Sequence, residues 1–170
     1  IGELNIYSCY SFQNSTILIK DLCKRAHDLH LEAIALTDIN NMYGAVEFSN
    51  ECHKYDIKPI FGMQGNVNVE GEIYPFLLLA KDQVGYHDLM KICSDINLSD
   101  QKAIDLEKLR LYHEHLFILS GCKEGIVERC VLKELESEAL RYMALFKEMF
   151  KDNYYICLQD HGIQMQKHLN

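Results

Sequence analysis

The sequence predicts an α/β fold built on a parallel sheet, and three observations lead to this class. Short apolar runs, such as residues 33–38 and 116–120, end in polar residues, which is typical of buried strands. Stretches with apolar residues at helical spacing, such as 45–55 and 85–96, lie between these runs. Strands that alternate with helices form parallel sheets with right-handed crossovers. Because the strands are short and buried, a barrel or partial barrel is favoured over an open sheet.

The first half of the chain contains two predicted strand–helix units. Residues 3–10 alternate in polarity with period two, which indicates a strand, and the Asn-Ser-Thr run at 14–16 supplies turn and N-cap groups for the helix that follows. The second strand covers residues 33–38. Asn40 and Asn41 then provide turn and N-cap chemistry before a helix that begins at Ala45.

The second half continues the alternation. Strands are predicted at 58–63, 73–80, 116–120 and 154–158, with a hairpin connection at 65–72, a helix from Gly85 and a surface loop at 97–107. Residues 125–150 are long enough for two helices, and the apolar stripe breaks near Lys133 and Glu134. A final helix is predicted after the last strand. No repeat or linker interrupts the chain, so residues 1–170 are predicted to be a single domain fragment.

Composition and charge limit the classes of function. Apolar residues make up 48% of the chain and charged residues 25%, as in soluble globular proteins. The net charge of −8 and the scattered basic residues argue against direct nucleic-acid binding, which needs clustered Lys and Arg. No apolar run is long enough to span a membrane. The seven cysteines include no CxxC pair and fall mostly in apolar stripes, which favours free buried thiols and a cytoplasmic location.

Polar residues at the ends of the predicted strands are the candidates for a site, because these ends converge at the mouth of a barrel. Asp38 is the strongest acid among them, and its alternative role is to cap the following turn by accepting backbone N–H bonds. Asp160 and His161, after the last strand, are weaker candidates. Cys122 is a candidate ligand or nucleophile, but no basic group is close in sequence to activate it, so a packed thiol is favoured.

Other reactive motifs are missing or lie at the wrong end. His113 and His115 precede a strand, on the side that serves stability in barrels, and are predicted to be exposed loop residues. No Gly-rich phosphate loop, GxSxG elbow or HExxH helix occurs. On chemistry alone, the sequence predicts a scaffold shaped for a site but lacking a working set of reactive groups.

Six segments resemble a known family, in the right order and at fitting spacings: NIYSCYS, ALTDINNMYGAVEF, KPIFGMQ, FLLLAKDQVGY, LFILSGC and YYICLQDHG. Over essentially the whole chain they are similar to the N-terminal PHP (polymerase and histidinol phosphatase) domain of bacterial DNA polymerase III alpha subunits. The resemblance implies a distorted (β/α)7 barrel, truncated before its closing strands. It also implies that the polymerase palm, fingers and thumb are absent from this chain.

Active members of this family use a three-metal cluster of Zn, Mn or Fe to hydrolyse phosphoesters, and the resemblance implies where the ligands would stand. Asn5 and Tyr7 replace the HxH pair of the first strand, and Ile39 replaces the His of a TDH motif. The implied ligand positions are Asn5, Tyr7, Asn14, Ile39, Gln64, Pro75 and Cys122. Only Cys122 keeps the family's ligand type. The resemblance therefore implies a degenerate metal site, no cofactor in this fragment and no hydrolysis.

The resemblance implies a structural and interaction role within a larger alpha subunit, whose polymerase site would use Mg. Expected partners are the rest of that subunit and replisome proteins such as an exonuclease or a clamp. The alternative is an active metal-dependent phosphoesterase or 3'-5' proofreading nuclease, and a weaker one is a stand-alone partner-binding module. Because a truncated barrel leaves strand edges exposed, we expect this chain to pair with another copy or to belong to a larger chain.

Overall fold

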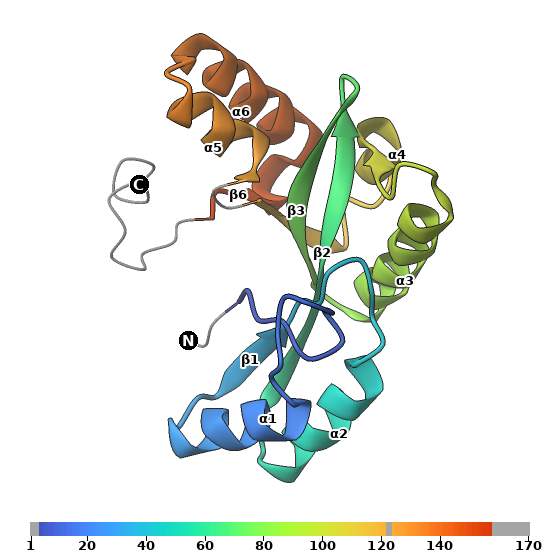
Figure 1. Ribbon diagram of the computed structural model, residues 1–170, viewed down its shortest axis with the longest axis vertical. Coiled ribbons are helices and arrows are strands. Elements are labelled where there is room, and N and C mark those ends of the chain that lie inside the picture. Colours follow the sequence, from blue (N-terminus) through green and yellow to red (C-terminus); the bar gives the residue numbers. More distant parts are fainter. Residues whose placement is uncertain (1–3, 122–123, 158–170) are drawn as a thin grey trace.

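The computed structural model of the protein describes residues 4–121 and 124–157 (Figure 1). Within these residues a six-stranded sheet has the order β1-β2-β3-β5-β6, and β4 pairs with β2. The strands are β1 (Ala33–Leu36), β2 (Lys58–Val69), β3 (Glu72–Ala80), β4 (Ile104–Asp105), β5 (Leu116–Ser120) and β6 (Tyr154–Tyr155). The helices are α1 (Ile19–Asp28), α2 (Ala45–Lys54), α3 (Gln83–Leu98), α4 (Leu106–Arg110), α5 (Ile126–Leu132) and α6 (Glu136–Phe150), followed by the 3-10 turn η2 (Lys151–Asn153).

The sheet is mixed, so the prediction of a parallel sheet is wrong in part. β1 with β2, β2 with β4 and β5 with β6 are parallel, whereas β3 is antiparallel to both β2 and β5. The cause is a two-residue hairpin loop in which Glu70 and Gly71 both have positive φ, 55° and 92°. Such a turn joins neighbouring antiparallel strands. The hairpin predicted at 65–72 is therefore present, with much longer arms than expected.

β2 continues six residues past its predicted end at Met63 because its pattern continues. Met63, Val67 and Val69 are buried on one face, while Gln64 and Asn66 on the other face are only half-buried. This period of two allows the strand to run through Gly62 and Gly65 without a break. Figure 1 shows the result: β2 passes from the end of the molecule that holds β1, α1 and α2 to the end near α4 and α6.

The predicted first strand, residues 3–10, is not a strand in residues 4–10: residues 4–8 have no regular structure beyond a bend, and residues 9 and 10 lie in a turn. The N–H of Ile6 donates to the Thr37 hydroxyl oxygen at 2.9 Å, and the N–H of Ser8 donates to the Asp38 carboxylate at 2.7 Å. The Thr37 N–H in turn donates to the Ile6 carbonyl at 2.9 Å. Because side chains accept the backbone donors of this segment, no regular ladder forms with β1.

Several other boundaries differ from the predictions. α3 extends to Leu98, and the predicted loop 97–107 contains β4 and the start of α4, which bury Ile104 and, in the next turn, Leu109. The last strand ends at Tyr155, three residues earlier than predicted, and the predicted final helix lies outside the described residues. The break near Lys133 and Glu134 is confirmed, since α5 ends at Leu132 and α6 begins at Glu136.

Neither of the first two helices has the side-chain cap that the sequence predicts. Leu18 and Gly44 occupy the N-cap positions of α1 and α2, and neither makes a side-chain capping bond. Asn41 holds the turn before α2 instead, because its side-chain oxygen accepts the Tyr43 N–H at 3.2 Å and its amide donates to the Tyr10 carbonyl at 3.1 Å. The predicted turn chemistry is thus present and the predicted cap is not.

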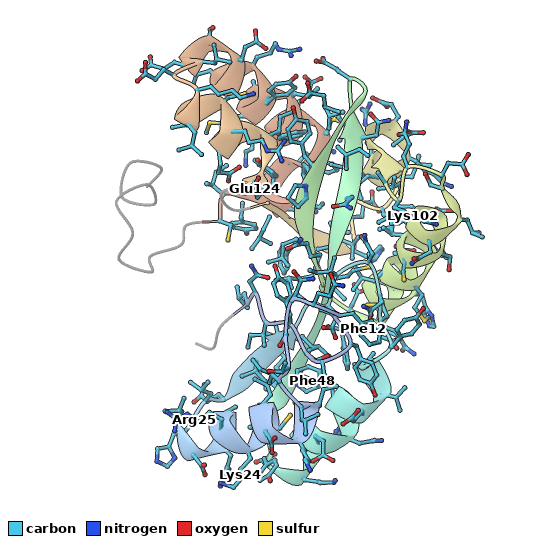
Figure 2. All side chains as sticks on the ribbon, viewed as in Figure 1. Phe12, Lys24, Arg25, Phe48, Lys102 and Glu124 are labelled. Atoms are coloured by element: carbon cyan, nitrogen blue, oxygen red, sulfur yellow. The ribbon has the colours of Figure 1, made fainter. Side chains whose placement is uncertain are left out.

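Three apolar clusters hold the fold together. The largest packs α3, α5 and α6 on one face of β2, β3 and β5, and the second packs α1 and α2 against β1 around the fully buried Phe48, labelled in Figure 2. The third is small and covers the other face of the sheet through Ala35, Leu77, Leu79 and Leu119. The six described cysteines are free thiols. In the described part of the chain, no helix is long and apolar enough to cross a membrane.

Candidate functional site

The candidate site lies where segment 4–11 passes the C-terminal end of β1. Thr37 and Asp38, the first two residues after β1, are both buried and point their oxygens at this segment. The Thr37 hydroxyl donates to the Ile6 carbonyl at 3.1 Å and lies 3.4 Å from the Asn5 side-chain oxygen. The side chains of Thr37 and Asp38 therefore join segment 4–11 to the C-terminal end of β1. Residues at this end of a strand are the ones expected from the sequence to form a site.

Asp38 is the centre of this arrangement. Its carboxylate is 2% exposed and accepts three hydrogen bonds: from the Ser8 N–H and the Ser11 hydroxyl on Oδ1, at 2.7 and 2.6 Å, and from the Ser8 hydroxyl on Oδ2, at 2.7 Å. Hydrogen bonds from several neutral donors are one way to keep a buried carboxylate satisfied. The expected alternative role, capping of the following turn, is wrong in its partner: Asp38 holds a segment about thirty residues earlier.

The turn after Asp38 is held by the backbone of β2 instead. The Gln64 N–H donates to the Asp38 carbonyl at 3.1 Å, and the Asn40 N–H donates to the Gln64 carbonyl at 2.8 Å, which makes a parallel bridge between Ile39 and Gln64. Asn40 has a φ of 52°, in the left-handed region that Asn tolerates better than most residues. This bridge places Gln64 beside the end of β1.

Two of the implied ligand positions bind each other. The Tyr7 hydroxyl donates to the Gln64 side-chain oxygen in a short hydrogen bond. The Gln64 amide oxygen is a neutral and weak metal ligand, and one of its two lone pairs accepts this proton. Tyr7 would also have to lose a proton whose reference pKa is about 10.

The other described positions offer still less to a metal ion. Ile39 has an apolar side chain, and its N–H donates to the Ser11 hydroxyl oxygen at 3.0 Å. Asn14 is exposed and its amide donates to the Phe12 carbonyl at 3.0 Å, within its own turn. Pro75 lies in β3 opposite Asn66 and carries no donor atom in its side chain. Cys122, Asp160 and His161 lie outside the described residues.

The close approach of Gly121 to β3 also shapes this edge. A Cβ at Gly121 would lie 2.0 Å from the Pro75 carbonyl oxygen, so only glycine fits at this position, just after the end of β5.

A surface hollow of about 280 Å³ lies beside the Asp38 network, and its lining contains no charged side chain among the described residues. Four asparagines, at 14, 40, 41 and 97, supply most of its polar groups.

The described donor set does not fit a cluster of divalent ions. Such ions need several anionic or imidazole ligands held together, and the implied ligand positions supply neutral amides, a phenol and apolar groups. In residues 4–121 and 124–157, no three His, Cys, Asp or Glu side chains are grouped so that they could hold a metal ion.

Sequence reasoning missed the partners of Asp38. Ser8 and Ser11 are 0% and 2% exposed, and their i,i+3 spacing on a segment rich in hydroxyl groups was the one available signal. It also missed a buried acid beyond β5: Glu128, on α5, accepts a short hydrogen bond from the Ser120 hydroxyl. Burial raises the pKa of Glu128, and the Ser120 hydroxyl partly offsets this by lowering it. Ser120 shares its face of β5 with Ile118, in the large cluster, so this pair lies on the helix-covered side of the sheet.

His113 and His115 lie at the other end of β5, as predicted from their position before the strand. His115 Nδ1 is 2.8 Å from the Asp82 carboxylate, which also accepts the Gly85 N–H at the start of α3. His113 Nδ1 lies 2.9 Å from the Arg110 carbonyl oxygen. Both histidines are half-buried rather than fully exposed. They do not approach the Asp38 network.

The chain is similar to known proteins over nearly its whole length. DNA polymerase III subunit alpha of Borreliella burgdorferi is 32% identical over 182 residues, with 99% of this chain and 16% of that protein covered. DNA polymerase III subunit alpha of Bacillus subtilis is 31% identical over 161 residues, covering 92% of this chain and 14% of that protein. The chain thus spans about one seventh of the length of these relatives.

A solved structure of an amidohydrolase from Chromobacterium violaceum superposes with a TM-score of 0.44 and 19% identity, covering 54% of this chain and 32% of that one. The sequence profile described as "PHP domain" matches residues 3–161, which is nearly the whole chain and includes every described element. On the strength of that match, the chain belongs to the PHP domain family.

Proposed function

We propose that this chain is the PHP domain of a bacterial DNA polymerase III alpha subunit, with a degenerate metal pocket that now serves a structural role. The observation that carries the proposal is the internal bonding of the pocket: Tyr7 is bonded to Gln64, and Asp38 is bonded to Ser8 and Ser11. Groups that would face metal ions in an active member instead fasten the N-terminal segment to β1 and β2. The similarity to the alpha subunits of two bacteria supports the assignment to that branch.

In this proposal the domain is a scaffold of a DNA-synthesising, cytoplasmic protein and performs no hydrolysis itself. Nucleotidyl transfer with Mg would belong to other domains of the subunit. The barrel of the family would be completed by further chain beyond this sheet, and replisome proteins such as an exonuclease or clamp would be its further partners. The acidic composition, with 25 acids against 17 basic residues, supports a protein-contacting role over a DNA-contacting one.

Metal analysis tests the structural role directly. The chain would be purified without chelator, incubated with Zn, Mn and Fe(II) salts, desalted, and analysed for metal by plasma mass spectrometry. Hydrolysis of bis(p-nitrophenyl) phosphate would be followed in parallel with and without EDTA. We expect far less than one ion per chain and no EDTA-sensitive hydrolysis. Stoichiometric metal together with hydrolysis that EDTA abolishes would instead establish an active phosphoesterase or nuclease.

The assignment to a polymerase subunit has its own test. The reading frame that encodes this chain is expected to continue into a segment with the carboxylates of a polymerase palm, and the product should extend a DNA primer in the presence of Mg. A complete gene that encodes this domain alone would contradict the assignment and favour a stand-alone partner-binding module.

A further inference from the structure

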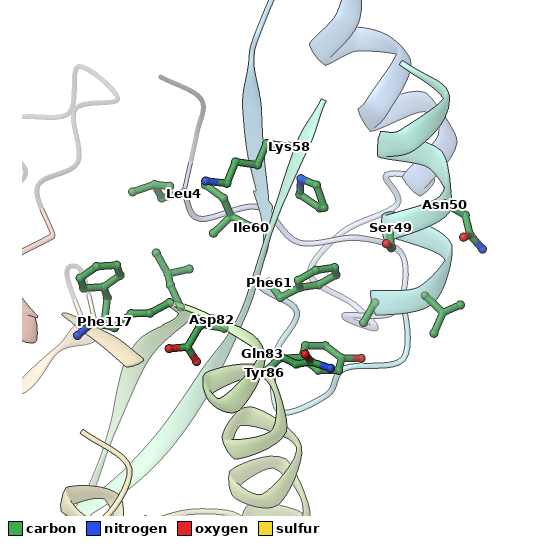
Figure 3. A pocket seen from close by; sticks show the side chains of 16 residues that line it. Leu4, Ser49, Asn50, Lys58, Ile60, Phe61, Asp82, Gln83, Tyr86 and Phe117 are labelled. Carbon is green, nitrogen blue, oxygen red and sulfur yellow. The ribbon is translucent and has the colours of Figure 1, made fainter. Parts of the chain in front are cut away.

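A groove opens beside the first residues of β2, where β2 and β3 diverge (Figure 3). It has a volume of about 760 Å³, and its walls come from α2, the first residues of β2, the end of β3 and the start of α3. Most of its lining is apolar, including Val46, Ile60, Phe61, Tyr86 and Phe117. In Figure 3, Ile60 and Phe117 lie on one side of β2, and Phe61 lies on the other. We call it the β2–β3 groove.

The floor of the β2–β3 groove is a strand edge. Residues 58–61 of β2 pair with β1 on one side, whereas the pairing of β2 with β3 begins only at Gly62, opposite Leu79. On the β3 side, residues 58–61 therefore have no paired strand among the described residues. Exposed edges of this kind recruit further strands.

The register fixes which backbone groups this edge offers. The Lys58 N–H donates to the Glu32 carbonyl at 2.9 Å, toward β1. Because backbone groups alternate in direction along a strand, those of Pro59 and Phe61 point to the open side. Pro59 has no N–H, which fits a position without a strand partner on that side. The edge thus presents the Pro59 carbonyl and the Phe61 N–H, two residues apart.

These two groups suit an added parallel strand. In a parallel ladder one residue of the new strand donates its N–H to residue i−1 and accepts from the N–H of residue i+1. Opposite Ile60, these groups are the Pro59 carbonyl and the Phe61 N–H. An antiparallel strand opposite Ile60 would use the same two groups, so the edge accepts an incoming segment in either direction.

The charges at the rim indicate the character of that segment. Lys58 and Lys81 both line the groove, and neither takes part in any ion pair found among the described residues. Lys81 donates to the Glu114 carbonyl at 2.9 Å and lies over the Phe117 ring, contacts that leave its charge uncompensated. Asp82, the acid at the rim, contacts the His115 ring, so the groove lining carries two lysines against one carboxylate. In a chain of net charge −8, this groove is locally basic.

We propose that the β2–β3 groove is a docking site for an extended segment of a partner protein with alternating apolar and acidic side chains, which adds to the open edge of β2 as a strand opposite Ile60. Its apolar side chains would cover Val46 and Phe61 on one face of the added strand. Its carboxylates would lie on the other face, on the side of Ile60 and Phe117, where they would meet Lys58 and Lys81. The combination of an open edge, apolar walls and lysines outside ion pairs carries this proposal, which does not depend on the loss of metal binding proposed for the Asp38 network.

Peptide binding tests the proposal. The probe is a fluorescein-labelled hexapeptide of sequence EVEVEV, with KVKVKV as the matched control, and binding to the purified chain is followed by fluorescence anisotropy. We expect saturable binding of the acidic peptide, at least about tenfold tighter than that of the basic one, since two lysines contribute about fivefold each in water. Absence of saturable binding by the acidic peptide, or equal affinity for both, would overturn the proposal.

Variants and exchange measurements locate the binding. Lys58→Glu should weaken binding of the acidic peptide about tenfold, while Lys20→Glu, an exposed lysine on α1 outside the groove, should leave it unchanged. Val46→Glu, at a side chain 69% exposed, should also weaken it, with Leu140→Glu on α6 as the control at 65% exposed.

Hydrogen exchange of the Phe61 amide should slow when the peptide is bound, and unchanged exchange would overturn strand addition. Sedimentation of the chain alone distinguishes self-association. A dimer that Val46→Glu abolishes would assign the groove to a second copy and overturn the proposed partner.

Discussion

Removal of the Asp38 carboxylate tests whether the network around it holds the N-terminal segment in place. Asp38→Ala leaves the Ser8 N–H and the hydroxyls of Ser8 and Ser11 without their acceptor, and both serines are buried. A hydrogen bond to a charged group contributes about 1.5–3 kcal/mol, and a buried donor left unpaired costs about 1–3 kcal/mol. The hydroxyls can rotate to other acceptors, so the three contributions will not add fully. We expect the unfolding free energy to fall by about 3–5 kcal/mol.

This loss is a large fraction of the roughly 5–15 kcal/mol that stabilises a typical domain. Urea unfolding followed by circular dichroism measures it, and the midpoint should fall by more than about 1 M with little change in slope. Asp100→Ala, at an exposed aspartate, is the matched control and should change the free energy by no more than about 0.5 kcal/mol.

A double-mutant cycle separates the hydrogen bonds from the effects of lost packing. In a Ser8→Ala/Ser11→Ala background, the donors from the two hydroxyls are already gone, so Asp38→Ala should cost at least about 1 kcal/mol less than in the unaltered chain. If Asp38→Ala alone cost less than about 1 kcal/mol, or if the cycle showed no coupling, the Asp38 network would not be what fastens segment 4–11 to the sheet.

Three further predictions concern the site and the hairpin. Asn5→His combined with Tyr7→His should not restore metal binding, because the other implied positions stay neutral or apolar; stoichiometric zinc by plasma mass spectrometry would contradict this. The Arg141 guanidinium, with help from the Tyr142 hydroxyl, lowers the pKa of Glu70 to about 2. A carboxyl group whose pKa is lower in the folded chain than in the unfolded chain stabilises the fold at pH values above its unfolded pKa. This contribution is lost as the pH falls from about 4 toward 2, so Glu70→Gln should flatten the dependence of stability on pH in that range. Gly121→Ala should destabilise the chain by about 1–3 kcal/mol in urea unfolding, and an effect as small as that of exposed Ser137→Ala would contradict the close contact with Pro75.

Local pattern was sufficient for elements whose burial is encoded in neighbouring residues. β1 is four residues long and flanked by a buried Thr and Asp, so the apolar run and its polar end could both be predicted from 33–38. The boundary between α5 and α6 was predictable for the same reason, since the apolar stripe changes face at that point. In both cases the decisive contacts lie within a few residues of each other in sequence.

Pairing between distant segments could not be predicted in this way. The alternation in residues 4–10 is that of a strand, yet the donors of Ile6 and Ser8 are accepted by the side chains of Thr37 and Asp38 about thirty residues later. Strand direction could not be predicted either, because an apolar run such as β3 is compatible with either direction until its partner and the Glu70–Gly71 turn are known.

The bonding of Asp38 also explains why replacing single ligands would be insufficient to rebuild a metal centre at this site. Three donors occupy most of the lone pairs of this carboxylate, so a cation held by both oxygens must displace donors on Oδ1, and one of these, the Ser8 N–H, belongs to the backbone of the segment that carries Asn5 and Tyr7. Displacing it would loosen the same segment that has to supply two of the ligands. Metal binding and the observed fold of segment 4–11 therefore compete for one carboxylate. The proposed inert pocket follows from that competition as well as from the neutral residues that surround it.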